Sequence, residues 1–124
     1  MHIVATVPPT KQSFTALPLP PAIYLILLAL DDGEAHGYRI RTAVIERSGG
    51  LVTLDPGSLY RHIARLVDDG VIAESPARPR AEGDERRRYY RLTPLGRRLL
   101  TAETERMATL VAAARAKAKR PKPA

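Results

Sequence analysis

The sequence LDPGSLYRHIARLVDDGVI, residues 54–72, decides how the chain is expected to fold. Asp55 is a good helix cap, Pro56 is tolerated in a first helical turn and Gly70 ends helices well, so the stretch predicts a helix over residues 56–69. At about 100° per residue, one side of this helix collects the apolar residues Leu59, Ile63, Leu66 and Val67. The opposite side collects Ser58, Arg61, His62 and Arg65. The stretch therefore predicts a helix with a core face and a compact basic face.

Two helices are expected before this one. Pro21 suits a first helical turn, and the apolar residues 22–30 (AIYLILLAL) predict a buried helix behind it. Residues 31–37 (DDGEAHG) predict a turn and the start of a second helix over about residues 38–47, which the following SGG should end. Residues 1–17 contain prolines and no apolar periodicity, so we expect them to form an extended arm.

Two short strands are expected after the helix of residues 56–69. Residues 71–74 (VIAE) and 86–92 (RRRYYRL) predict these strands, and alternation in the second strand places Tyr90 and Leu92 on the core face. The polar connection between them contains two prolines and a glycine, which suits an exposed hairpin tip.

A long helix over residues 93–117 should close the fold, followed by a basic tail at residues 118–124. Thr93 can cap this helix and Pro94 suits its first turn. Its apolar stripe comprises Leu99, Leu100, Met107, Leu110, Val111 and Ala114. The stripe either covers the body of its own domain or pairs with a second copy. Because it continues farther than a domain of this size can cover, we expect a dimerisation helix.

The composition predicts one cytoplasmic domain. The chain has 124 residues, of which 44% are hydrophobic, and no cysteine, which excludes disulfides and thiolate metal sites. Its longest apolar run has nine residues, whereas a membrane helix needs about 20. His2, His36 and His62 lack the spacing of metal ligands, and no glycine-rich phosphate loop or nucleophile elbow is present. We therefore expect no enzymatic activity, no metal, no cofactor and no membrane partner.

The net charge of +7 is concentrated in two places. Residues 115–124 carry five positive charges and no negative one, so the rest of the chain has a charge of about +2. Six arginines between Arg78 and Arg91 accompany three carboxylates. These patches either keep the protein soluble or bind nucleic acid.

The order helix, helix, turn, helix, hairpin predicts a mainly α (α+β) fold. It is a winged helix-turn-helix with a two-stranded wing, occupying residues 18–92, followed by a C-terminal dimerisation helix. A helix with a small cationic face can enter the major groove of DNA, and a hairpin carrying arginines can lie along the neighbouring backbone. Both elements carry the appropriate charge in the appropriate order here.

Three segments resemble the PadR-type bacterial transcriptional regulators. They are GEAHGYRIRTAVIERSGG (33–50), LDPGSLYRHIARLVDDGVI (54–72) and RRRYYRLTPLGRR (86–98), and the resemblance covers about residues 17–112. It implies a homodimer that binds a two-fold symmetric operator in double-stranded DNA, often as a repressor released by a small-molecule effector or a stress signal. The single helix after the wing resembles the short branch of that family.

The residues expected to contact DNA lie on the third helix and the wing: Ser58, Tyr60, Arg61, His62, Arg65, Arg86, Arg87 and Arg88. Each has a simpler interpretation. The basic helix face is otherwise an ordinary solvated surface, and the wing arginines are partly neutralised by nearby carboxylates. Tyr38 and Tyr60 either lie half-buried in the core or contact phosphate.

Two other functions remain compatible with the sequence. A winged helix can be a protein-interaction module whose Arg61/Arg65 face binds an acidic partner. Alternatively, the basic tail can make the protein a non-specific architectural DNA binder. Equal affinity for every duplex would indicate the second of these functions.

Overall fold

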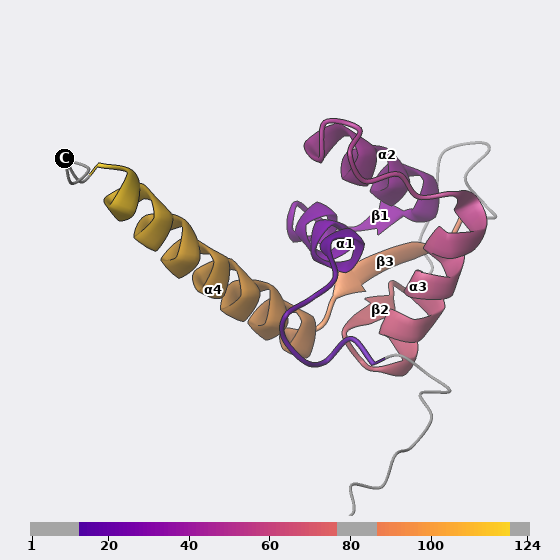
Figure 1. The fold of residues 1–124 in the computed structure, drawn as a ribbon. Coiled ribbons are helices and arrows are strands. Elements are labelled where there is room, and N and C mark those ends of the chain that lie inside the picture. Colours follow the sequence, from indigo (N-terminus) through magenta and orange to yellow (C-terminus); the bar gives the residue numbers. More distant parts are fainter. Residues whose placement is uncertain (1–12, 77–86, 120–124) are drawn as a thin grey trace, which may run out of the picture.

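Four helices and a small sheet make up the part of the chain that the computed structural model describes, residues 13–76 and 87–119 (Figure 1). In chain order the elements are α1 (Pro21–Asp31), β1 (Ala35–His36), α2 (Gly37–Arg47), α3 (Pro56–Asp68), β2 (Ile72–Glu74), β3 (Tyr89–Leu92) and α4 (Pro94–Ala118). The expected mainly helical fold, in which three helices precede a hairpin and a long helix follows it, is confirmed.

Three helices begin where a side chain caps the first turn. At the start of α3, Asp55 accepts a hydrogen bond from the Ser58 N–H at 3.2 Å. At the start of α4, Thr93 Oγ1 accepts one from the Gly96 N–H at 3.1 Å. His36 Nδ1 does the same for α2. These caps satisfy backbone donors that the helices leave unpaired, which explains why the elements start at these residues.

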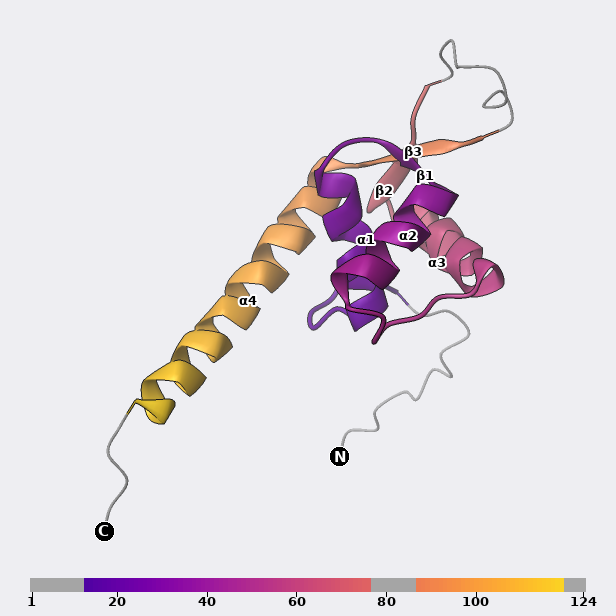
Figure 2. The same cartoon turned by 90° about the horizontal axis from the view of Figure 1, so that it is seen from above.

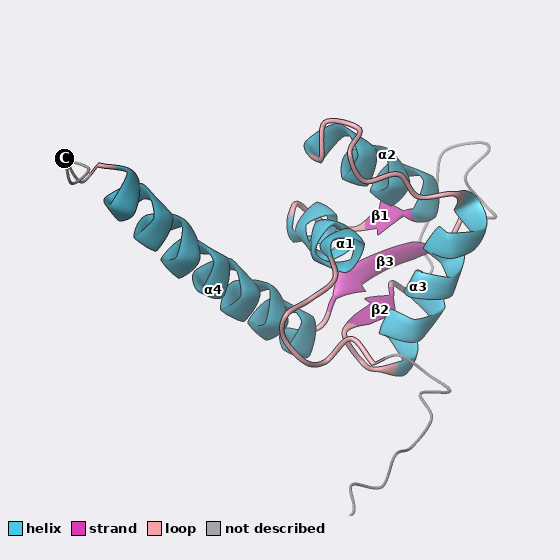
Figure 3. Cartoon of the chain, in the orientation of Figure 1, coloured by secondary structure: helices cyan, strands magenta, loops and turns pink. Residues whose placement is uncertain are grey.

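In the described residues the sheet has three antiparallel strands, in the order β1-β3-β2 (Figure 3). β2 and β3 form the expected hairpin, with Ile72 opposite Leu92, and β3 begins only at Tyr89. On the other edge of β3, β1 places Ala35 opposite Tyr90. The sequence had predicted only a turn and a helix start in this region. Two residues carry no periodicity, so this strand is defined only by its pairing with β3.

The core lies between α1, α2, α3, the sheet and the first turns of α4. Its fully buried side chains are Ile23, Ile26, Leu27, Ile40, Val44, Leu59, Leu66, Val71 and Ile72. The expected core face of α3 is confirmed at Leu59, Ile63 and Leu66, but Val67 is 38% exposed and was wrongly assigned to the core. Val67 lies at the edge of the apolar arc, where neighbouring elements cover only part of its side chain.

α4 is divided into a docked half and a projecting half (Figures 1 and 2). Leu99 and Leu100 are buried in the core of their own chain, next to α1, so the expectation that they contact a second copy is corrected. From residue 108 to residue 119 every side chain is exposed. Within the described residues, no helix combines the length and apolar character that crossing a membrane requires.

Residues 13–19 pack against the domain, although residues 1–17 were expected to form an arm. Phe14 is only 2% exposed, and its N–H donates to Asp69 Oδ2 at 3.0 Å. The Leu19 N–H donates to Glu103 Oε2 on α4 at 2.9 Å. Two apolar residues among prolines form no period, so the sequence pattern could not reveal this contact. Residues 1–12 and the tail from residue 120 lie outside the described residues.

Candidate functional site

The exposed face of α3 centres on the middle of the helix. Tyr60 is 52% exposed, and Arg61 and Ala64 are also exposed. Ser58 and Arg65 flank this face and are half-buried. Of the four residues in the predicted basic face, Arg61 is exposed and the other three are half-buried, so the exposed face is centred on Tyr60 and Arg61.

A chain of hydrogen bonds fixes the beginning of this face. Ser58 Oγ donates to Asp55 Oδ1 at 2.6 Å, and Arg61 Nη2 donates to Ser58 Oγ at 2.9 Å. The bonds from the Ser58 hydroxyl and backbone lower the pKa of Asp55 below its usual value, and the nearby Arg61 guanidinium contributes. Asp55 is therefore ionised at neutral pH and is linked to Arg61 through Ser58. Sequence position alone identifies Asp55 as a helix cap, and the link to Arg61 is visible only in the structure.

His62 does not belong to the exposed face. Its ring meets the ring of Phe14 edge-on, with centroids 5.7 Å apart, and the side chain is half-buried. Burial lowers the pKa of His62, and the neighbouring Arg61 charge lowers it further. His62 is therefore neutral at pH 7, and its expected contact with DNA is replaced by a contact with the N-terminal segment. The sequence could not indicate this because the covering residue is far away in the chain.

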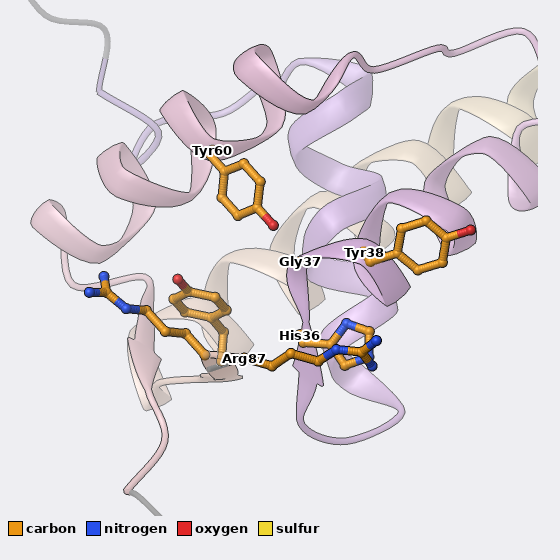
Figure 4. A pocket seen from close by; sticks show the side chains of 7 residues that line it. His36, Gly37, Tyr38, Tyr60 and Arg87 are labelled. Atoms are coloured by element: carbon orange, nitrogen blue, oxygen red, sulfur yellow. The ribbon is translucent and has the colours of Figure 1, made fainter. Parts of the chain in front are cut away.

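A hollow of about 390 Å³ lies beside the exposed face, between α2, α3 and β3 (Figure 4). Its lining residues are His36, Gly37, Tyr38, Tyr60, Arg87, Arg88 and Tyr90. The Tyr60 ring points toward Gly37, where an added Cβ would lie 2.7 Å from the Tyr60 hydroxyl oxygen. This close approach explains why glycine stands between His36 and Tyr38. It also shows that Tyr60 borders both the helix face and the hollow.

Polar groups from three elements meet at this hollow. Arg87 Nη1 lies 3.1 Å from His36 Nε2, and the His36 ring packs edge-on against Tyr89 at 5.3 Å. Arg88 is exposed, and its Nε atom lies 4.0 Å from Glu74 Oε2. Tyr38 is 67% exposed, so it is not a core residue. Two guanidinium groups and the exposed Tyr60 phenol make this hollow suitable for an anion such as a phosphate.

The remaining predicted site residues are Arg86 and the apolar residues on the distal half of α4. Arg86 lies outside the described residues. On the distal half of α4, Met107 is half-buried, whereas Leu110, Val111 and Ala114 are exposed. Within the described part of the chain, no group of three or more metal-ligating side chains is present.

Comparisons with known proteins connect this arrangement to one family. The family model described as "Transcriptional regulator PadR-like family" matches residues 26–102. A 37.1 kDa protein of transposon TN4556 from Streptomyces fradiae is 45% identical over 86 residues, which are 69% of this chain and 23% of that protein. The chain thus spans about a quarter of the length of that relative.

Two solved structures illustrate the similarity of fold. A PadR family transcription regulator from Clostridium difficile R20291 is 26% identical, with a TM-score of 0.65, over 76% of this chain and 94% of that chain. Bacillus subtilis PadR, solved in complex with operator DNA, is 22% identical, with a TM-score of 0.57, over 86% of this chain and 50% of that chain. At that identity the second similarity concerns the fold alone.

Proposed function

The chain belongs to the PadR-like family of transcriptional regulators, and from this we propose that it binds double-stranded DNA with sequence specificity. The observation that carries this proposal is the exposed Tyr60/Arg61 face of α3 beside a hollow that contains Arg87 and Arg88. In this arrangement α3 enters the major groove, and its first turns reach the base edges. Bacillus subtilis PadR, which shares this fold, was solved in complex with operator DNA, and this supports DNA as the partner.

The hollow then receives a phosphate of the DNA backbone. Arg87 and Arg88 supply positive charge at the base of the wing, while Tyr60 supplies a hydroxyl donor from α3 on the opposite wall. Contacts of this kind position a protein on the duplex and carry no sequence information by themselves. Specificity must therefore come from α3.

The regulator acts as a homodimer in this proposal. The exposed Leu110, Val111 and Ala114 lie on the same side of the projecting half of α4, where a second copy would cover them. A dimer presents two copies of α3 to a two-fold symmetric operator. On the basis of the family resemblance, we further propose a repressor that a small molecule or stress signal releases by changing the separation of the two helices.

A binding measurement tests the proposal. The purified protein is titrated with a duplex from its own promoter and with a scrambled duplex of the same length, over about 50–300 mM salt. We expect an affinity for the promoter about 1,000-fold tighter than for the scrambled duplex. The double substitution Arg61→Ala and Arg65→Ala should weaken promoter binding and reduce this preference, whereas Arg98→Ala, on α4, removes the same type of charge and should leave the preference intact.

Two results would contradict the proposal. Equal and steeply salt-dependent affinity for both duplexes, and for duplexes selected from random sequence, would indicate an architectural DNA binder. No binding at the lowest salt concentration would exclude DNA as the partner and favour an acidic protein partner for the Arg61/Arg65 face.

A further inference from the structure

The hydrogen-bond chain Asp55–Ser58–Arg61 at the beginning of α3 has a role that the proposed function leaves open. We propose that Arg61 reads a guanine base in the operator, and that Asp55 and Ser58 are positioning residues that hold its guanidinium for this contact. The inference rests on the proposed DNA-binding function and names the residue of α3 that determines specificity.

Arg61 is better placed for a base contact than Arg65, the other arginine of α3. Arg61 is exposed and lies in the first half of the helix, whereas Arg65 is half-buried and lies in the last turn. The N-terminal residues of a recognition helix are the ones that reach base edges in the major groove. Arg65 would therefore approach the edge of the groove rather than its floor.

The direction of the hydrogen bonds explains how Arg61 is held. The single hydroxyl proton of Ser58 is donated to Asp55 at 2.6 Å, so Ser58 Oγ is left as an acceptor for Arg61 Nη2 at 2.9 Å. Asp55 is itself fixed because it caps the Ser58 N–H at 3.2 Å. One of the five guanidinium N–H groups is used in this way, and a bidentate contact with guanine O6 and N7 needs two more. Holding the planar fork before binding reduces the entropy that the contact costs.

The Asp55 carboxylate also favours a base over a phosphate as the partner of Arg61. A carboxylate linked to the guanidinium through one hydroxyl reduces the attraction of this site for a second anion. A guanine edge is uncharged and offers two acceptors, so this carboxylate opposes it less. Recognition of guanine thus fits the local charge better than recognition of phosphate.

The test is a base-by-base measurement on the full chain. The preferred duplex is selected from random sequence with the wild-type protein, and every position of one half-site is then replaced by each of the other three bases. For the wild type, we expect replacement of one guanine to weaken binding about 5- to 150-fold. Arg61→Ala should abolish discrimination at that position alone. Ser58→Ala should reduce it about 2- to 10-fold at the same position.

Three further variants separate positioning from stability and from charge. Ser58→Thr keeps a hydroxyl and should restore discrimination. Asp55→Asn keeps a good helix cap and an acceptor for the Ser58 hydroxyl but removes the charge, so it should retain the guanine preference and bind all duplexes more tightly. Arg65→Ala should weaken binding to every sequence about equally. Thermal unfolding of each variant identifies any loss that comes only from reduced stability.

Each possible outcome has a definite consequence. If Arg61→Ala weakens all duplexes uniformly and lowers the salt slope by about 1, Arg61 contacts phosphate and the inference is wrong, while the proposed function stands. If Ser58→Ala leaves discrimination unchanged, Asp55 and Ser58 have no positioning role. If the wild-type protein shows no preference for any base, both the inference and the proposed function are wrong.

Discussion

At the scale of single residues, Gly96 is the described glycine at which an added Cβ would meet the closest neighbouring atom. An added Cβ there would lie 2.1 Å from the Val71 carbonyl oxygen. The same carbonyl accepts hydrogen bonds from the Thr93 N–H at 3.1 Å and the Thr93 hydroxyl at 2.9 Å, so it cannot move without breaking the start of α4. Gly96 therefore allows the first turn of α4 to pass close to Val71, in the connection between α3 and β2.

This contact predicts the sign of the effect of Gly96→Ala. Helix propensity alone would make the variant more stable by about 1 kcal/mol. The clash with Val71 should instead lower the free energy of unfolding by about 1–3 kcal/mol, as overpacked sites do. Urea unfolding followed by circular dichroism measures the difference. A variant as stable as the wild type or more stable would show that α4 can shift away from Val71.

Single side chains also mark where prediction from the sequence reached its limit. The periodicity of α3 correctly identified Leu59, Ile63 and Leu66 as core residues, because that pattern depends only on local geometry. The same periodicity placed His62 on a basic surface, whereas Phe14, from a segment 48 residues away, covers it. No local pattern contains information about such a distant neighbour, and this is also why the exposure of Tyr38 could not be foreseen.

At the scale of elements, the N-terminal segment joins α3 to α4. Phe14 contacts His62 and bonds to Asp69 at the end of α3, whereas Leu19 bonds to Glu103 on α4. Glu103 is 1% exposed and also accepts hydrogen bonds from Arg106 at 2.6 and 3.0 Å. These Arg106 bonds, followed by the Leu19 N–H bond, lower the pKa of Glu103 despite its burial. The ionised carboxylate therefore holds the segment in place at neutral pH.

Glu103→Leu should destabilise the protein at pH 7 by about 1–3 kcal/mol, since the Leu19 N–H would then be buried without a partner. Glu103→Gln keeps an acceptor and should cost less.

Because the folded-state pKa of Glu103 lies below the unfolded value of 4.5, its stabilising effect is complete above that pH and is lost as the pH falls below it. The difference between the unfolding midpoints of the wild type and Glu103→Leu should become smaller as the pH falls from 7 to 3. A constant difference over that range would contradict this role of the carboxylate.

The elements themselves differed in how well the sequence predicted them. Prolines open α1, α3 and α4, and Asp55 and Thr93 cap α3 and α4, so these helices were found from signals that lie next to the residues they affect. β1 and the docked N-terminal segment were missed because they exist only through contacts with β3, α3 and α4. Local sequence signals predict where elements begin and end. Short segments that form only through contacts with distant residues can be identified only in the structure.

At the scale of the whole molecule, the projecting half of α4 is the largest part of the described chain that its own domain does not cover (Figure 2). Leu110 is 57% exposed and Val111 is 47% exposed on this half. A helix of 25 residues is about 37 Å long, so its far end is well removed from the domain core. Burial of this surface by a second copy would link the two DNA-binding domains rigidly.

Leu110→Asp should therefore convert the proposed dimer into monomers, because the partner helix would have to bury a carboxylate. Light scattering after gel filtration measures the mass, and Ala112→Asp, on the opposite side of α4, is the matched control that should remain dimeric.

The monomer keeps α3 and should still bind a single half-site as the wild type does. Its affinity for a duplex with two half-sites should fall about 100- to 10,000-fold, since the second contact is no longer intramolecular. A Leu110→Asp protein with unchanged mass would place the dimer contact elsewhere, and a monomeric wild type would remove the premise of a two-fold operator.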